Sequence, residues 1–286
     1  MRIGTALAVT TSPAEVVAAA ADAARRGLDS FWVNQMPGGW DPLTLLALLD
    51  ERPPEIGTAI VATYPRHPVT LATEAVTLQA VKPGLVLGIG PSHAWFIEQQ
   101  LGFSYASPLR HTREYLSVLR PLLRGSNVSF NGEFYTVESA LTVTAPPPPV
   151  LMSALGPRML ELARELADGV VLTWVTPSVV ADRIVPAVAP GARVVAGVGV
   201  VLSTDPDAAR EQITREFGFA GELPAYRDAL QRFGIRGIAD TVIVGDESTI
   251  AAEIERFRDA GATDVVLLPF GGSQERATIL DVVTDR

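Results

Sequence analysis

Short apolar runs without internal charge recur along the chain and alternate with segments of helical spacing. The runs are rich in β-branched residues, which is typical of parallel strands that are buried on both faces. A series of βα units closes into a barrel or stays open as a doubly wound sheet, and eight runs favour a (β/α)8 TIM barrel. The predicted strands are Arg2–Ala8, Ser30–Val33, Ile56–Ala62, Leu85–Ile89, Val150–Met152, Val170–Trp174, Val194–Leu202 and Val265–Pro269.

Clear start signals precede the helical segments. Ser12 and Glu15 form a capping box around Pro13, and the pairs Asp41-Pro42 and Asp205-Pro206 repeat the pattern of a cap followed by proline. The alternation of strand and helix has no break that would mark a domain boundary. We therefore expect one barrel domain over residues 1–286.

Two segments do not fit a minimal barrel. Asn127–Thr144 alternates apolar and polar residues around Asn131-Gly132, a strong signal for a two-residue hairpin turn, so we predict a hairpin insertion before strand five. Phe217–Thr241 mixes glycine, proline and aromatic residues, and we expect it to form a lid or flank.

The composition limits the classes of function. The chain has 286 residues, no cysteine and a formal net charge of −9. Nucleic-acid binding depends on Lys and Arg that neutralise phosphates, so this charge argues against a nucleic-acid partner. The lack of cysteine excludes disulfides and thiolate metal sites. No stretch has the length of an apolar membrane span and the first residues lack the pattern of a secretory signal, so we expect a cytoplasmic protein.

In a barrel of this kind the site lies where the strands end, so the residues after each run are the candidates. They include no carboxylate pair, no His/Asp/Glu cluster for a metal and no G-x-S-x-G motif, so we expect neither hydrolytic nor metal chemistry. Such a site suits hydride transfer, in which the chemistry belongs to an organic cofactor. The candidate segments are Val9–Thr11, Asn34–Trp40, Thr63–His67, Gly90–His93, Ser153–Arg158, Trp174–Pro177, Ser203–Thr204 and Phe270–Gly272.

The segment after strand five predicts a phosphate-binding turn. The four residues from Ser153 to Gly156 would leave free backbone N–H groups at a helix N-terminus, where the helix dipole favours an anion. Pro157 fits the first helical position, and Arg158 adds a cation beside the turn. An ordinary strand-to-helix connection has the same local sequence, so both interpretations stay open at this point.

Histidine and tryptophan residues at strand ends are further candidates. His67 contacts a ligand or starts a helix, His93 contacts a ligand or caps a helix, and Trp174 lines a pocket. Trp40 walls a pocket or packs on its loop. His111 lies among charged neighbours on a predicted helix, so we expect it on the solvated surface.

Taken together, these residues resemble the luciferase-like flavin and deazaflavin oxidoreductases, in particular the branch that uses coenzyme F420. The resemblance covers most of the chain in the right order, and the succession of motifs is more specific than any one of them. The motifs are Gly57-Thr58-Ala59-Ile60, Thr63-Tyr64-Pro65-Arg66-His67-Pro68, Leu87-Gly88-Ile89-Gly90-Pro91-Ser92-His93, Tyr105 with Pro108, Arg113-Glu114-Tyr115-Leu116, Leu119-Arg120, Gly132-Glu133-Phe134-Tyr135, Ser153-Ala154-Leu155-Gly156-Pro157-Arg158, Ala167-Asp168-Gly169 and Asp259-Ala260-Gly261-Ala262-Thr263-Asp264.

The resemblance implies a (β/α)8 barrel with a hairpin insertion, which binds the deazaflavin with its phosphate at the Gly156 turn. It also implies a cis peptide bond between Ala59 and Ile60, against the central ring of the cofactor. The expected cofactor contacts are Ala59, Ile60, Gly90, His93, Ser153, Ala154, Leu155, Gly156, Pro157, Arg158 and Trp174.

The chain departs from the alcohol-oxidising relatives at one place. They have a catalytic histidine after strand two, where this chain has Asn34-Gln35, and an amide takes up no proton near neutral pH. We therefore expect the reductase direction, in which the reduced coenzyme donates a hydride and His67, His93 or water supplies the proton. The predicted substrate contacts are Asn34, Gln35 and Trp40, and the expected substrate is a small apolar or planar molecule.

Two other functions stay open. An FMN-dependent monooxygenase of the same family would have the same phosphate turn, which does not distinguish the two rings. A flavin-binding barrel without turnover fits the lack of a strong general base. Relatives commonly pair, so we expect a homodimer, and the sequence does not identify the substrate.

Overall fold

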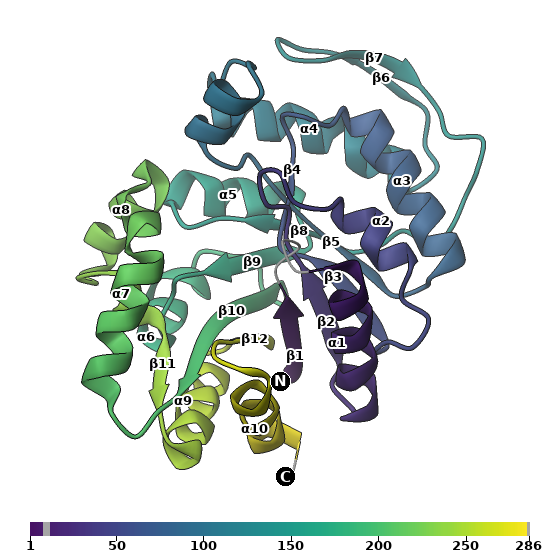
Figure 1. Ribbon diagram of the computed structural model, residues 1–286. Coiled ribbons are helices and arrows are strands. Elements are labelled where there is room, and N and C mark those ends of the chain that lie inside the picture. The colour runs from purple at the N-terminus through teal and green to yellow at the C-terminus, as the bar shows by residue number, and fades with distance from the viewer. Residues whose placement is uncertain (8–11, 285–286) are drawn as a thin grey trace.

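Eight parallel strands form a closed barrel in the computed structural model, and helices surround it (Figure 1). Each strand pairs with the next along the chain, and β12 pairs with β1 to close the ring, which confirms the predicted barrel. The structure describes residues 1–7 and 12–284, so the candidate segment Val9–Thr11 lies outside the described residues. The barrel strands are β1 (Arg2–Leu7), β2 (Ser30–Val33), β3 (Glu55–Thr58), β5 (Leu85–Gly90), β8 (Val150–Ser153), β9 (Gly169–Thr173), β10 (Arg193–Leu202) and β12 (Asp264–Pro269).

The remaining strands are short and lie outside this simple ring. The third predicted run splits into β3 and β4 at the Ala59–Ile60 peptide bond, which is cis as the resemblance implies. A further edge strand, β11, pairs with the end of β10. These elements are β4 (Val61–Ala62), β6 (Val128–Asn131), β7 (Thr136–Ser139) and β11 (Ile243–Gly245).

The predicted helix starts are confirmed by their caps. Ser12 Oγ accepts a hydrogen bond from the Glu15 N–H, and Glu15 Oε2 accepts one from the Ser12 N–H. Asp41 and Asp205 cap the helices that start at the following prolines. The helices are α1 (Pro13–Arg25), α2 (Pro42–Ala47), α3 (Pro68–Val81), α4 (Pro108–Leu123), α5 (Pro157–Leu166), α6 (Pro177–Val179), α7 (Pro206–Glu222), α8 (Pro224–Phe233), α9 (Glu247–Asp259) and α10 (Ser273–Thr284), with the shorter η1 (Trp95–Gln100), η2 (Val180–Ile184) and η3 (Ile238–Thr241). None of the helices in the described ranges combines the length and the apolar character needed to cross a membrane.

Side chains fill the interior of the barrel. The indole of Trp32 lies fully buried there and donates from Nε1 to Ser30 Oγ at 2.8 Å. A Cβ atom on Gly57 would lie 2.3 Å from Trp32 Cε3, so only glycine leaves room for this ring. Trp32 packs with Val86, Leu151, Val171, Val195 and Val266.

An ionic cluster occupies the N-terminal end of the barrel, formed by the first residues of four strands. Arg193 Nη2 lies 2.5 Å from both Asp264 Oδ1 and Glu55 Oε2, and Arg2 Nε lies 3.0 Å from Asp264 Oδ1. Burial by itself would lower the pKa of Arg193. The hydrogen bonds to Asp264 and Glu55 together outweigh this effect and raise the pKa above its usual range. These ion pairs link β1, β3, β10 and β12 at the N-terminal end of the barrel.

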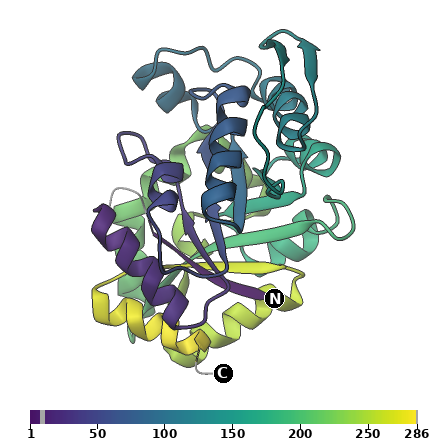
Figure 2. The ribbon, with the colours of Figure 1, turned by 90° about the vertical axis from the view of Figure 1, so that its right-hand side faces the viewer.

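The hairpin insertion is confirmed, but the predicted two-residue turn is wrong. Strands β6 and β7 pair antiparallel with Asn131 opposite Thr136, so the turn has four residues, from Gly132 to Tyr135. The buried carboxylate of Glu114 on α4 accepts hydrogen bonds from the backbone N–H groups of turn residues 133, 134 and 135, at 3.0, 2.8 and 3.3 Å. These bonds favour the wider turn, and the hairpin projects beyond α4 (Figure 2).

The expectation that His111 lies on the solvated surface is wrong. His111 is 3% exposed, its ring stacks on Tyr64 with centroids 3.7 Å apart, and its Nε2 lies 2.8 Å from the Tyr135 hydroxyl. The neighbouring Arg110 does face solvent. The carboxylate of Glu114, in contrast, accepts hydrogen bonds from the backbone of the hairpin turn. Burial lowers the pKa of His111 to about 4, against a smaller opposing effect of Glu114, so the imidazole is neutral at pH 7.

The segment Phe217–Thr241 is largely helical. It contains the end of α7, all of α8 and η3, and it forms a flank of the barrel (Figure 1). Helix α7 therefore runs further than the glycine and aromatic residues of this segment indicate.

Candidate functional site

Strand three breaks at the C-terminal end of the barrel, and residues at and just after the end of β2 hold the backbone before and after the break. The Gln35 N–H donates to the Ile60 carbonyl at 3.1 Å, and Gln35 Oε1 accepts from the Ala62 N–H at 2.9 Å. The Ala59 N–H donates to the Val33 carbonyl at 2.8 Å. Gln35 therefore holds the backbone on both sides of Val61, just after the break, and its amide oxygen is already engaged.

Three predicted cofactor residues meet next to this break. A Cβ atom on Gly90 would lie 2.1 Å from Ser153 Oγ and 3.5 Å from Ile60 Cδ1, so the ends of β5 and β8 approach closely only because residue 90 is glycine. Ala59 and Ile60 are half-buried and pack on the inner core. The result is a small, largely apolar surface at the mouth of the barrel.

The turn between β8 and α5 is open. Gly156 is the N-cap of α5 with φ −89° and ψ 150°, and within the described residues no side chain caps the first turn of this helix. A Cβ atom on Gly156 would meet no atom within 4 Å. Arg158 is exposed in the first turn of α5. The turn therefore presents free N–H groups and open space, which are the requirements of an anion site at a helix N-terminus.

Helix α8 contributes residues that the sequence does not reveal. Arg232 Nη1 reaches the carbonyl of Leu155 in the turn, at 3.5 Å, and α8 lies beside the start of α5 in Figure 1. Tyr226 of the same helix meets His93 edge to face, with ring centroids 4.8 Å apart. The flank thus borders both the turn and the end of β5, and it brings a second cation to the turn.

The two histidine candidates have different surroundings. His93 is half-buried, and this burial lowers the pKa of His93, so the ring has one N–H donor and one acceptor at neutral pH. His67 is exposed and caps α3, because its Nδ1 accepts from the Val69 N–H at 3.2 Å, and its ring meets Tyr135. The structure therefore shows the helix-start role for His67 and leaves His93 as the histidine beside α8.

The tryptophan candidates also differ. Trp174 has φ +56°, and its ring lies 6.4 Å from that of Phe217, which in turn lies 4.8 Å from that of Phe270. Trp40 is 52% exposed on the loop after β2. Trp174 is part of an aromatic group between the barrel and α7, whereas Trp40 presents its ring to solvent.

The sequence model of one family, described as luciferase-like monooxygenase, matches residues 1–264. The chain belongs to this family. An F420-dependent glucose-6-phosphate dehydrogenase of Rhodococcus erythropolis is 28% identical over 92% of this chain and 90% of its own length. A 5,10-methylenetetrahydromethanopterin reductase of Methanolobus tindarius is 30% identical over 52% of this chain and 47% of its own length.

The barrel of this luciferase-like chain also matches solved structures. The coenzyme F420 dependent tetrahydromethanopterin reductase of Methanopyrus kandleri superposes with a TM-score of 0.82, at 21% identity, over 98% of this chain and 97% of that chain. This likeness confirms the fold. The family and the F420-dependent relatives together support an oxidoreductase as the general class of enzyme.

Proposed function

We propose that this luciferase-like protein is a coenzyme F420-dependent oxidoreductase that reduces a small apolar or planar organic acceptor. The observation that carries the proposal is the open Ser153–Gly156 turn at the start of α5, next to the apolar surface where Gly90, Ser153 and Ile60 meet. The F420-dependent relatives support the choice of this coenzyme.

The residues of the site fit the coenzyme. Gly156 leaves room and backbone N–H groups for a phosphate, and the cations Arg158 and Arg232 lie on either side of the turn. Ala59 and Ile60 offer an apolar face to a flat ring. When bound, the coenzyme supplies the hydride, and the chain binds and orients it and keeps water from one face.

The proposed direction of the reaction rests on the two residues that follow β2. At the position after β2, the Gln35 amide oxygen holds the Ala62 N–H, and neither this amide nor that of Asn34 takes up a proton near pH 7. The group proposed to supply a proton to the reduced acceptor is water or His93. Because burial lowers the pKa of His93, its ring would first take up from solvent the proton that it passes on. The exposed Met36 and Trp40 near the mouth favour an apolar substrate.

Binding and turnover test the proposal separately. Fluorescence titration should show that F420 binds at least about tenfold more tightly than FMN. Stopped-flow mixing of the reduced F420 complex with activated alkenes and imines should restore the absorbance of the oxidised deazaflavin. Tighter binding of FMN would indicate the monooxygenase instead. Fast oxidation of alcohols by oxidised F420 would contradict the direction, and a bound coenzyme that reduces no acceptor would indicate a non-catalytic barrel.

Arg232 offers a sharper test of the binding mode. Replacement by glutamine (Arg232→Gln) should weaken the affinity for F420 about fivefold, because one charge-assisted contact to the anionic part of the coenzyme is lost. The affinity for the phosphate-free ribityl deazaflavin should not change. Arg227→Gln is the matched control, because Arg227 lies on the same helix and pairs with Asp228. An equal loss of affinity for both ligands would contradict a role of Arg232 at the phosphate.

A further inference from the structure

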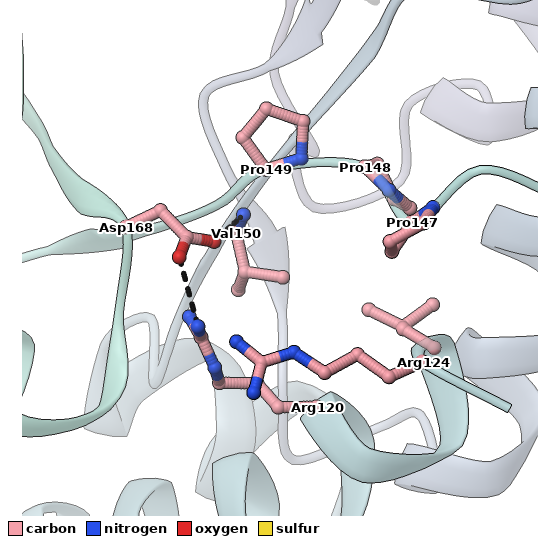
Figure 3. Close-up of a pocket in the computed structure, with 8 residues that line it drawn as sticks. Arg120, Arg124, Pro147, Pro148, Pro149, Val150 and Asp168 are labelled. Carbon is pink, nitrogen blue, oxygen red and sulfur yellow. Dashed lines mark hydrogen bonds and ion pairs between the residues drawn. The ribbon is translucent and has the colours of Figure 1, made fainter. Parts of the chain in front are cut away.

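A cavity of ≈ 260 Å³ lies at the opposite end of the barrel from the proposed coenzyme site. Figure 3 shows the residues that line it. It is bordered by the C-terminal end of α4, by the prolines that lead into β8, and by the residue before β9. Strands β8 and β9 start here, so the cavity is at the N-terminal end of the barrel. Its occupancy is therefore independent of the proposed function.

The charges around this cavity are not balanced. Arg120 Nη2 lies 2.8 Å from Asp168 Oδ1, and Asp168 Oδ2 accepts from the Val150 N–H at 2.8 Å, so both oxygens of the one carboxylate are used. Arg124, one helical turn after Arg120, also lines the cavity, and within the described residues its side chain has no recorded ion pair. Two guanidinium groups thus face a single carboxylate that has no oxygen free of a hydrogen bond.

Arg120 also carries an unused donor. Its side chain is 15% exposed, and its Nη1 is buried without a hydrogen-bond partner among the described residues. A buried donor without a partner is unfavourable, and an anion that reaches it would supply the missing acceptor. Arg124 is exposed, so its side chain is able to move and bind the same anion from the other side.

The shape of the cavity restricts the anion. The wall opposite the arginines is formed by Pro147–Pro149, whose ring nitrogens carry no N–H (Figure 3). Leu123 adds a further apolar side chain to the lining. The donors therefore lie on one side and apolar surface on the other. The volume is below the roughly 300–1,000 Å³ of sites for drug-sized ligands, so the occupant is small.

We propose that this cavity binds a small organic carboxylate. The planar guanidinium groups of Arg120 and Arg124 hold the carboxylate, for which their geometry is suited, and the apolar part of the ligand packs on Pro147–Pro149. A free phosphate has no apolar part to place against this wall, so it binds less well.

Benzoate is a suitable probe, with benzamide as its neutral counterpart and inorganic phosphate as the anion without an apolar part. In calorimetric titrations of the full chain at low salt, we expect saturable binding of one benzoate and no comparable binding of benzamide or phosphate. Arg124→Gln should raise the Kd for benzoate about tenfold. The control is Arg215→Gln, which removes the same charge from an exposed position on α7.

Thermal unfolding checks that both variants are folded. Arg124 is suited to the test because its side chain makes no hydrogen bond or ion pair within the described part of the chain. Equal binding of benzoate and benzamide, or a phosphate affinity equal to that of benzoate, would overturn the proposal. So would an unchanged benzoate affinity in the Arg124→Gln protein, because the ligand would then lie elsewhere.

Discussion

Replacing Gly156 with leucine should weaken the binding of F420 by about 100-fold or more, because the side chain would occupy the phosphate position and several charge-assisted hydrogen bonds would be lost. The backbone at Gly156 has φ −89° and ψ 150°, a conformation open to any residue. Among residues 1–7 and 12–284, no atom lies within 4 Å of a Cβ atom placed there, so the variant should fold normally. The measurement is the Kd from fluorescence titration, together with the melting temperature.

Gly237→Leu is the matched control. Gly237 also has an extended backbone, with φ −171°, and open space at its Cβ position. It precedes η3, in a segment that faces α9 on the outside of the barrel. This control should bind F420 like the wild-type protein. Full affinity for F420 in the Gly156→Leu protein would refute the proposed position of the phosphate. It would not contradict F420 as the coenzyme of the wild-type protein.

Replacing Asp264 with alanine should lower the free energy of unfolding by about 3–5 kcal/mol, because the buried guanidinium of Arg193 loses one of its two carboxylate partners and only Glu55 remains. Asp264 is 1% exposed, and it accepts from both Arg193 and Arg2 at the start of the barrel strands. For a domain of this size the melting temperature should fall by roughly 5–15 °C. Differential scanning calorimetry measures this change directly.

Glu211→Ala provides the comparison on the surface. Glu211 pairs with Arg215 at 3.9 Å on α7, and both side chains are exposed, so its loss should change the melting temperature by about 1 °C or less. If the two variants melted alike, the ionic cluster at the N-terminal end would contribute no more than a surface pair. The barrel would then owe its closure to strand pairing and apolar packing.

The strands could be predicted because their patterns are local. Runs such as Val194–Leu202 lack internal charge since both faces of the sheet are covered, and the caps at Ser12 and Asp41 act within three residues. The Ser153–Gly156 turn was predicted for the same reason, since strand, glycine and proline follow one another directly.

The contacts made by distant residues could not be predicted in this way. Arg232 reaches Leu155 across 77 positions, and no local pattern links the two. The charged neighbours of His111 indicate a solvent-exposed position. The carboxylate of Glu114 is instead hydrogen-bonded by backbone N–H groups of a hairpin turn, and such groups carry no sequence signal. The sequence leaves the role of His67 open because histidine is not among the common N-cap residues.

The Glu114 carboxylate has a consequence for the exchange of segments between members of this family. Because this carboxylate accepts hydrogen bonds from three N–H groups of the turn before Thr136, the hairpin and α4 depend on each other for their conformation. A hairpin grafted from another barrel would meet a buried, unpaired carboxylate unless its turn offered the same donors. In chimeric proteins, the smallest transferable unit is therefore residues 108–139 as a whole, with the crossover points placed outside both elements.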